Sequence, residues 1–170
     1  MRKVLVIGSG GAGKSTFARR LGEVLGLEVI HLDTLYWNPD WIETPRDVWR
    51  ERVAKLVERE AWIIDGNYSN TFDIRVEACD TLIFLDTART VCLWRIIKRA
   101  FMYRNTNRPD MAEGCPERLS LEFVLWVWNY PTRTRPRVLE LMKTNAERKM
   151  IVRLRSQSEI ESFLASARDI

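Results

Sequence analysis

Short apolar runs recur along the chain, and each of them ends in turn residues or in a carboxylate. The five runs lie at 3–7, 27–32, 61–64, 81–85 and 150–154. Between the first two runs, Phe17, Leu21 and Val24 are three or four positions apart, which is the spacing of one helix face. Strands that alternate with helices predict an α/β fold of three layers, in which helices cover both faces of a five-stranded parallel sheet.

The composition agrees with a single globular domain over residues 1–170. Hydrophobic residues make up 46% of the chain, and a chain of this length is long enough to bury a proper core. The longest apolar stretch, 119–128, is too short to span a bilayer, and no signal-peptide pattern precedes the first run. Cys79, Cys92 and Cys115 are widely separated, which indicates reduced thiols rather than disulfides or a zinc site. We therefore expect a cytoplasmic protein without a membrane partner, whose oligomeric state the composition leaves open.

A glycine-rich motif follows the first apolar run and precedes the first helix. It matches G-x-x-x-x-G-K-[ST], and its position between a strand and a helix distinguishes a phosphate loop from a chance match. Glycines let backbone N–H groups converge on phosphate oxygens, to which the helix N-terminus adds its dipole. Lys14 supplies a charge for the β- and γ-phosphates, and the hydroxyl of Ser15 is a ligand for Mg²⁺. The motif predicts that the chain binds a nucleoside triphosphate through Gly8, Ser9, Gly10, Gly11, Ala12, Gly13, Lys14, Ser15 and Thr16.

Two further apolar runs are followed by carboxylates, Asp33 and Asp65. Ligands of open parallel sheets bind at the carboxyl ends of the strands, so we expect both carboxylates to face the crevice beside the phosphate loop. His31 alternates to the other side of its strand, which favours a packed or capping role over a catalytic one. Arg75 lies a short connection beyond Asp65, and it either swings into the crevice or stays on the surface beside a nearby carboxylate.

Three aromatic residues, Tyr36, Trp37 and Trp41, lie in the connection that follows Asp33. Asn38-Pro39-Asp40 makes a turn between them. Large rings in so short a connection are hard to bury together. They therefore belong either to the core or to a surface for base stacking or substrate binding.

The basic residues are unevenly distributed, although the net charge is only +4. Between residues 89 and 108 there are six basic residues and no acidic one, and five of the six are arginines, whose planar forks suit phosphate. They form either a solvated face or a set of phosphate ligands that includes Arg95, Arg99, Arg104 and Arg108. Residues 105–116 carry no periodicity and many turn residues, which predicts a loop that moves.

Several motifs along the chain together resemble one protein family. They are the phosphate loop, His31-Leu32-Asp33, Leu35-Tyr36-Trp37, Asp65-Gly66-Asn67-Tyr68, Phe84-Leu85-Asp86, Cys92-Leu93-Trp94-Arg95 and Gly114-Cys115-Pro116-Glu117. In this combination, which covers nearly the whole chain, the sequence resembles the bacterial FlaR-type "DNA topology modulation" proteins. These proteins are part of the adenylate-kinase-like branch of P-loop proteins.

The resemblance implies an acceptor-binding insert at 34–60 and an arginine-bearing lid at about 95–118. Asp65-Gly66 is similar to the Asp-Gly that opens the substrate-phosphate motif of nucleotide kinases, whose aspartate helps to hold hydrated Mg²⁺. That motif continues with Pro and Arg, whereas this chain continues with Asn67-Tyr68 and has its arginine at Arg75. The departure speaks against a nucleoside monophosphate acceptor. Asp33 is placed like the strand-two aspartate of shikimate and gluconate kinases, which handles a substrate hydroxyl or supports the metal.

These features favour ATP-dependent phosphoryl transfer to a small acceptor, a reaction that depends on positioning and on charge neutralisation. The expected catalytic residues are Lys14, Asp33, Arg95, Arg99 and Arg104. The expected acceptor contacts are Asp33, Tyr36, Trp37, Trp41, Gly66, Asn67 and Arg75. Ser15 and, through a water molecule, Asp65 are expected to hold Mg²⁺. A hydroxyl acceptor needs its proton removed, for which Asp33 is best placed, whereas a phosphate acceptor needs no general base.

An alternative is a DNA-associated ATPase or an ATP-switched binding protein. The basic segment and the aromatic residues are compatible with base stacking, but the sequence has no helix-turn-helix, zinc-finger or RNA-binding motif. A lid explains the arginines equally well. The sequence therefore favours a kinase over a nucleic-acid partner and leaves the identity of the acceptor open.

Overall fold

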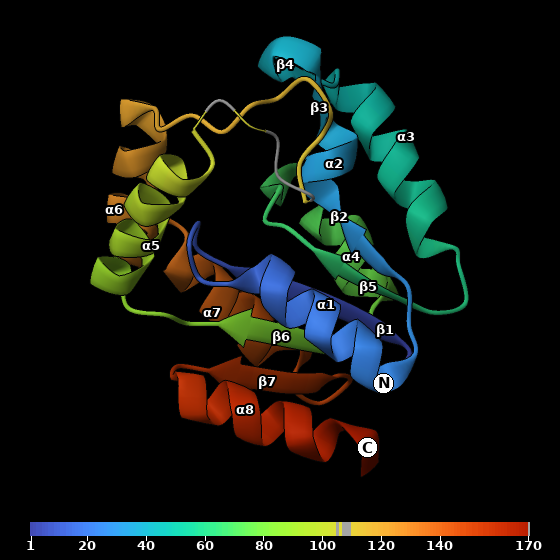
Figure 1. Ribbon diagram of the computed structural model, residues 1–170. Helices are drawn as coiled ribbons and strands as arrows, with labels where there is room; N and C mark the ends of the chain where they lie inside the picture. Colours follow the sequence, from blue (N-terminus) through green and yellow to red (C-terminus); the bar gives the residue numbers. More distant parts are fainter. Residues whose placement is uncertain (105, 107–109, 170) are drawn as a thin grey trace.

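The computed structural model describes residues 1–104, 106 and 110–169, and in these residues five strands form one parallel sheet (Figure 1). The strands are β1 (Lys3–Gly8), β2 (Val29–His31), β5 (Trp62–Asp65), β6 (Thr81–Leu85) and β7 (Met150–Leu154). Their order across the sheet is β2-β5-β1-β6-β7. Because β1 lies at the centre, the carboxyl ends of β5 and β6 flank the loop that follows it.

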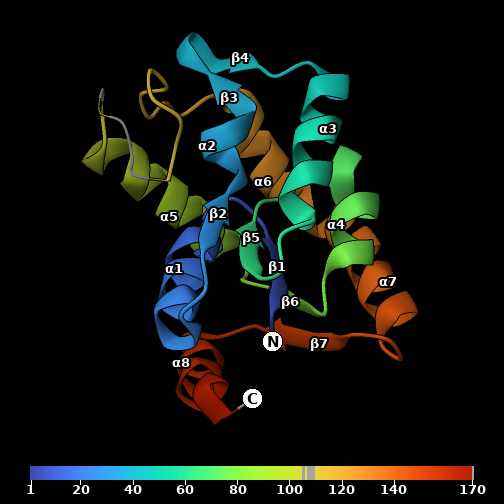
Figure 2. The same ribbon diagram turned by 90° about the vertical axis from the view of Figure 1, so that its right-hand side faces the viewer.

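Alternate side chains of β1 enter two separate cores on the two faces of the sheet. Val4 and Val6 pack with helices α1, α5, α6 and α8, whereas Leu5 and Ile7 pack with α3, α4 and α7. The two ribbon views show α1 and α8 on one face and α4 and α7 on the other (Figure 2). These helices are α1 (Lys14–Leu25), α3 (Arg46–Val57), α4 (Phe72–Ala78), α5 (Arg89–Met102), α6 (Leu121–Arg133), α7 (Arg135–Asn145) and α8 (Gln157–Ser166), with the 3-10 turns η2 (Ser69–Thr71) and η3 (Ala167–Asp169). The expected three-layer fold is confirmed. In the described part of the chain, no helix is long and apolar enough to cross a membrane.

The connection after β2 folds into a series of short elements. They are α2 (Leu32–Tyr36), β3 (Trp37–Asn38), η1 (Pro39–Trp41) and β4 (Ile42–Glu43), and β3 and β4 pair in antiparallel fashion. The strand expected over 27–32 therefore ends at His31, and Asp33 lies in the first turn of α2. Together with α3, these elements occupy the region expected to be the acceptor-binding insert.

The segment between α5 and α6, expected to be part of a lid, returns over this insert. Asn105, Asn107, Arg108 and Pro109 lie outside the described residues, so the phosphate contact expected of Arg108 cannot be placed. Further along, the amide of Asp40 donates to the carbonyl of Gly114 (3.0 Å), and the thiol of Cys115 donates to the carbonyl of Asn38 (3.1 Å). The expected lid and the expected insert are therefore in contact on the side of the sheet where β1 ends (Figure 1).

Candidate active site

Helices α5 and α6 pack closely against the glycine loop between β1 and α1. Gly11 and Gly13 have φ angles of 77° and 93°, a region that favours glycine. A Cβ atom on Gly10 would lie 2.6 Å from the ring of Phe123, and one on Gly11 would collide with the carbonyl of Cys92. The loop therefore needs glycine both for its backbone conformation and for the close approach of α5 and α6.

The polar groups of this loop fit a phosphate ligand. The ammonium of Lys14 donates to the carbonyl of Ser9 (3.1 Å), and the hydroxyl of Ser9 is buried without a hydrogen-bond partner among the residues described. Burial lowers the pKa of Lys14, which the charges of Asp65 and Asp33 oppose. Ser15 lies in the first turn of α1, where a helix N-terminus favours an anion.

A cavity of about 200 Å³ continues from the loop along α1. Its lining includes Thr16 and Phe17 of α1, Arg95 of α5, and Gln157 and Ile160 of α8. The guanidinium of Arg95 donates to the carbonyl of Ala12 (3.3 Å), so this arginine holds the loop while it lines the cavity. A ligand whose phosphates occupy the loop has room here for its nucleoside. The sequence analysis did not identify Gln157 and Ile160 as lining residues of this cavity. The one signal in the sequence is that both residues closely follow the last strand.

Carboxylates gather on the other side of the loop, at the ends of β2 and β5. His31 and Asp65 are paired in the sheet register, and Nδ1 of His31 lies 2.8 Å from Oδ1 of Asp65. Burial by itself lowers the pKa of His31. The hydrogen bond to Asp65 and the charges of Asp110 and Asp33 outweigh this effect and raise the pKa. The described part of the expected lid therefore brings Asp110, which the sequence did not single out, near His31.

Asp33 accepts a hydrogen bond from the hydroxyl of Tyr68 (2.6 Å). Tyr68 has a positive φ of 27°, and the centroid of its ring lies 4.5 Å from the ring centroid of Tyr36. Burial and the charge of Asp33 raise the pKa of the Tyr68 hydroxyl, so it stays protonated and donates to the carboxylate. This hydrogen bond fixes the orientation of Asp33.

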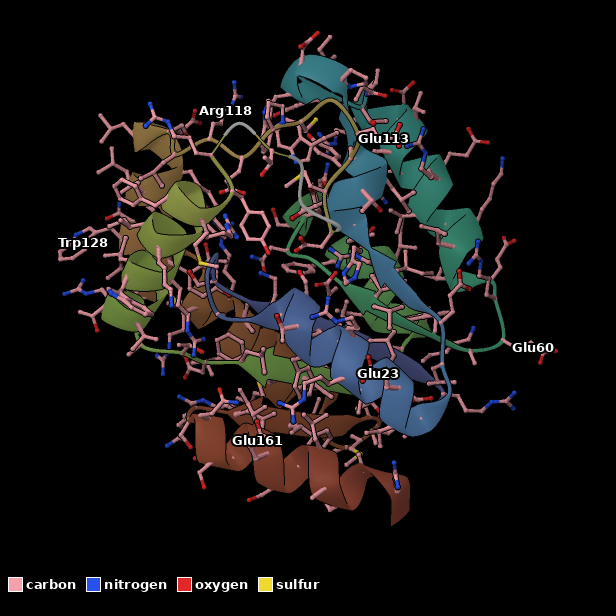
Figure 3. The ribbon with its side chains drawn as sticks, in the orientation of Figure 1. Glu23, Glu60, Glu113, Arg118, Trp128 and Glu161 are labelled. Carbon is pink, nitrogen blue, oxygen red and sulfur yellow. The ribbon has the colours of Figure 1, made fainter. Side chains whose placement is uncertain are left out.

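The three aromatic residues of the expected acceptor site are half-buried and form one cluster with Trp49 and Tyr68. The ring centroids of Tyr36 and Trp37 lie 5.0 Å apart, and those of Trp37 and Trp41 lie 5.3 Å apart. Arg118 lies on the segment that crosses over the cluster (Figure 3), and its guanidinium is 4.8 Å from the Trp41 ring centroid. The cluster therefore packs against the core through Trp49 and is also partly exposed, whereas core and surface were expected to be alternatives.

Arg75 is placed differently from both expectations. It is completely buried, and its guanidinium donates to the hydroxyl of Thr71 and to the carbonyls of Gly66, Asn67 and Tyr68 at 2.7–3.2 Å. Burial lowers its pKa to about 9. The prediction of a surface arginine is wrong, because the side chain is fully buried and its guanidinium is bound to backbone carbonyls. Its hydrogen bonds to three consecutive carbonyls stabilise the loop that follows β5.

Gly66 and Asn67, two further expected acceptor contacts, also take part in the loop structure. The side-chain amide of Asn67 donates to the carbonyl of Gly8 (2.7 Å) and accepts from the amide of Gly8 (3.4 Å). Gly66 has a φ of 136°, and a Cβ atom there would lie 2.9 Å from Leu32. These contacts connect the loop after β5 to the start of the phosphate loop.

The basic residues of α5 and of the segment just after it have different environments. Arg99 pairs with Glu117 through its Nε (3.1 Å), and its charge lowers the pKa of Lys14, so it lies near the phosphate loop. The side chain of Arg104 is exposed, and its backbone forms an isolated parallel β-bridge with that of Glu117. Lys98 is exposed and lies over the ring of Trp94. Arg95 and Arg99 therefore face the loop, whereas Lys98 does not.

Known proteins resemble this chain in structure but not in detectable sequence pattern. No family model matches the chain, and no curated protein matches it. A shikimate kinase from Acinetobacter baumannii in complex with shikimate superimposes with a TM-score of 0.63 at 20% identity, over 98% of this chain and 90% of that one. The chain has the P-loop kinase fold.

Two other solved structures agree with this assignment. A gluconokinase from Sinorhizobium meliloti superimposes with a TM-score of 0.55 at 16% identity, over 99% of this chain and 90% of that one. A sugar kinase from Janibacter gives a TM-score of 0.50 at 15% identity, over 99% and 91% of the two chains. At these identities the similarity establishes the fold alone, and the resemblance to FlaR-type proteins stays a prediction.

Proposed function

We propose that this chain is an ATP-dependent phosphotransferase that acts on a small acceptor with a hydroxyl group. One observation carries the proposal. Asp33, oriented by Tyr68, lies close enough to Lys14 of the phosphate loop for its charge to affect the pKa of that lysine. A phosphate-binding group and a candidate general base would therefore act together at one site, beneath the segment between α5 and α6.

The donor half of this crevice suits ATP. The loop amides and Lys14 would hold the β- and γ-phosphates, and Arg95 would lie beside the nucleoside. Ser15 and, through water, Asp65 offer the oxygen ligands that Mg²⁺ prefers. Mg²⁺, when bound, would supply positive charge to the phosphate oxygens. Arg99, and Arg104 if the lid closes further, would add charge on the side opposite Lys14.

The acceptor half suits a hydroxyl better than a phosphate. Asp33, Asp65 and Asp110 all act on His31, so an acceptor phosphate would approach several carboxylates at short range. Arg75, the arginine expected to hold such a phosphate, is buried and bound to backbone carbonyls. A hydroxyl would instead give its proton to the Asp33 carboxylate as it attacks the γ-phosphorus.

The structural neighbours support the same acceptor class. Their names refer to shikimate, gluconate and sugar, all of which are hydroxylated compounds. In this chain the half-buried cluster of Tyr36, Trp37 and Trp41 would contact the carbon skeleton of the acceptor. Contact between the 112–118 segment and this cluster would exclude water, which otherwise hydrolyses ATP.

The proposal is tested by measuring ADP release with a panel of acceptors. We expect at least one neutral polyhydroxy compound to stimulate release by wild-type protein, and phosphorylated compounds to stimulate it less. Lys14→Ala protein is the matched control for contaminating kinases, because it lacks the ammonium group expected to hold the β- and γ-phosphates. If double-stranded DNA stimulates release and no small compound does, a DNA-associated ATPase replaces the kinase.

A further inference from the structure

A second, larger cavity lies where β6 and β7 end, and one of its lining residues, Thr87, donates to the carbonyl of Ala12 in the phosphate loop (3.4 Å). Its volume is about 480 Å³, which is within the range of small-molecule sites. It is open to solvent on one side, and its lining comes from the ends of β6, β7 and α6 and from the first residues of α5 and α7. Among the residues described, it shares no lining residue with the cavity along α1. The two cavities are therefore neighbours that are lined by different residues.

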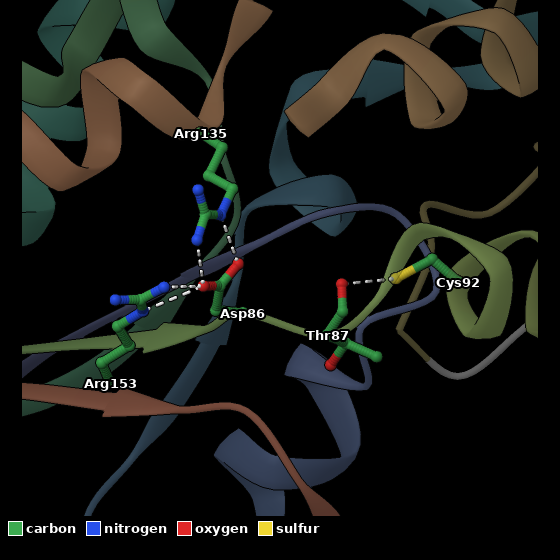
Figure 4. Close-up of polar contacts among 5 residues, drawn as sticks. All are labelled: Asp86, Thr87, Cys92, Arg135 and Arg153. Carbon is green, nitrogen blue, oxygen red and sulfur yellow. Dashed lines mark hydrogen bonds and ion pairs between the residues drawn. The ribbon is translucent and has the colours of Figure 1, made fainter. Parts of the chain in front are cut away.

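Arginine dominates the lining of this cavity. Arg89, Arg135, Arg153 and Arg155 face it, and the one acidic residue among its described lining is Asp86. Both oxygens of Asp86 are engaged: Arg135 donates to Oδ1 and Oδ2, and Arg153 donates to Oδ2, at 2.6–3.0 Å (Figure 4). One carboxylate thus serves two guanidinium groups and ties β6 to β7 and α7.

The other two arginines of the cavity have no carboxylate partner among the described residues. Arg89 lies over the ring of Trp128 (4.2 Å to the centroid), on the outer side of α6 (Figure 3). The side chain of Arg155 is exposed, and its backbone amide donates to the carboxylate of Glu159. In the wall of the cavity, Tyr130 is 4% exposed and its hydroxyl has no partner among the described residues. The cavity therefore holds an excess of donors and of positive charge.

We propose that this cavity binds a small organic phosphate at a site distinct from the nucleotide and acceptor sites. Guanidinium forks match phosphate oxygens, and several converging arginines with one carboxylate repel one another unless an anion joins them. The volume of the cavity leaves room beside a phosphate group for the carbon skeleton of an ester. A phosphate ester would place its phosphate among Arg89, Arg155 and Arg153 and its carbon skeleton against Tyr130 and Pro131.

The test is calorimetric titration of the full chain with glycerol 3-phosphate. The phosphate loop is first saturated with a non-hydrolysable ATP analogue, and glycerol and inorganic phosphate serve as comparison ligands. We expect glycerol 3-phosphate to bind, inorganic phosphate to bind more weakly and glycerol not to bind. Arg155→Ala should weaken binding about tenfold, because it removes a charge-assisted hydrogen bond. Arg155→Lys keeps the charge but loses the planar fork, so it should recover only part of the affinity.

Arg137→Ala is the matched control, because Arg137 is an exposed arginine of α7 outside the cavity lining. Its affinity for glycerol 3-phosphate should equal that of wild type. Equal losses in Arg137→Ala and Arg155→Ala would overturn the proposal, since general charge attraction would then explain the binding. Equal affinity for inorganic phosphate and the ester would reduce the site to one for the free ion. Absence of binding at millimolar concentrations would also overturn the proposal.

Discussion

The two halves of the crevice differ in charge and in how they are built. The donor half is built on one continuous loop and the helix that follows it, which hold Lys14, and α5 adds the positive groups of Arg95 and Arg99. The acceptor half brings together side chains from β2, α2, β5 and the segment after α5, and its charged groups near His31 are carboxylates. A continuous loop is specified by local sequence, whereas a composite surface depends on strand register and on loop contacts. The difference explains why the donor is identified more firmly than the acceptor.

Replacing the candidate base should have the largest effect on the acceptor half. Asp33→Asn keeps an oxygen that accepts from Tyr68 but cannot take a proton, so turnover with a hydroxyl acceptor should fall by roughly 10²–10⁴-fold. Steady-state ADP release measures this effect. Tyr68→Phe, which removes only the hydrogen bond to Asp33, should cause a smaller loss. If Asp33→Asn retains full turnover, the general-base role is wrong.

The corresponding change in the donor half is Lys14→Ala. Loss of one preorganised positive group at a transferring phosphate should lower turnover by roughly 10²–10³-fold. The melting temperature should not fall, because burial already lowers the pKa of Lys14 and its removal relieves an unfavourable burial. Unchanged turnover together with unchanged ATP affinity would contradict the assignment of the loop as the donor site.

Arg75 distinguishes a structural acceptor half from a ligand-binding one. Arg75→Met leaves the carbonyls of Gly66, Asn67 and Tyr68 without their donor, which should reduce the free energy of unfolding by about 3 kcal/mol. Urea denaturation of wild type and variant measures the change. A variant of wild-type stability with a raised KM for the acceptor would instead make Arg75 a substrate ligand.

Asn67 belongs to the acceptor half but is hydrogen-bonded to Gly8 of the phosphate loop, so its replacement should change the affinity for ATP. Asn67→Ala removes both hydrogen bonds to Gly8, and the affinity for ATP should fall about tenfold, the equivalent of one lost hydrogen bond of about 1.4 kcal/mol. Titration with a fluorescent ATP analogue measures it. An effect confined to the KM of the acceptor would show that Asn67 contacts the acceptor directly.

Asp86, outside both halves, supplies a reference for stability alone. Burial would raise its pKa, but the hydrogen bonds from Arg135 and Arg153 outweigh burial and lower it. A lowered pKa stabilises the fold above the ordinary carboxyl pKa, and this stabilisation is lost as the pH falls through the lowered value. Asp86→Asn should therefore destabilise the protein by about 1–3 kcal/mol near neutral pH. The difference from wild type should shrink below about pH 4, as thermal unfolding across pH will show.

The sequence predicted the fold and the phosphate loop because both depend on local patterns. Alternation of short apolar runs with helices specifies a parallel sheet, and the loop motif is contiguous. The role of Arg75 was not predictable, because its partners are backbone carbonyls that become available only when the loop after β5 folds around it. The pairing of His31 with Asp65 depends on the register between β2 and β5, and β2 ends one residue before the alternation argument assumed. Asp110 was missed because its proximity to His31 depends on how the segment after α5 returns.

The central claim, phosphoryl transfer to a hydroxyl, is tested most directly by following the γ-phosphate. Protein is mixed with ATP labelled in the γ-phosphate and with the best acceptor from the screen, and the products are separated after a single turnover. The account predicts that wild-type protein places the label in a phosphate ester of the acceptor and that Asp33→Asn protein leaves it in ATP. Label that appears only as inorganic phosphate, at the same rate with and without the acceptor, would contradict the account.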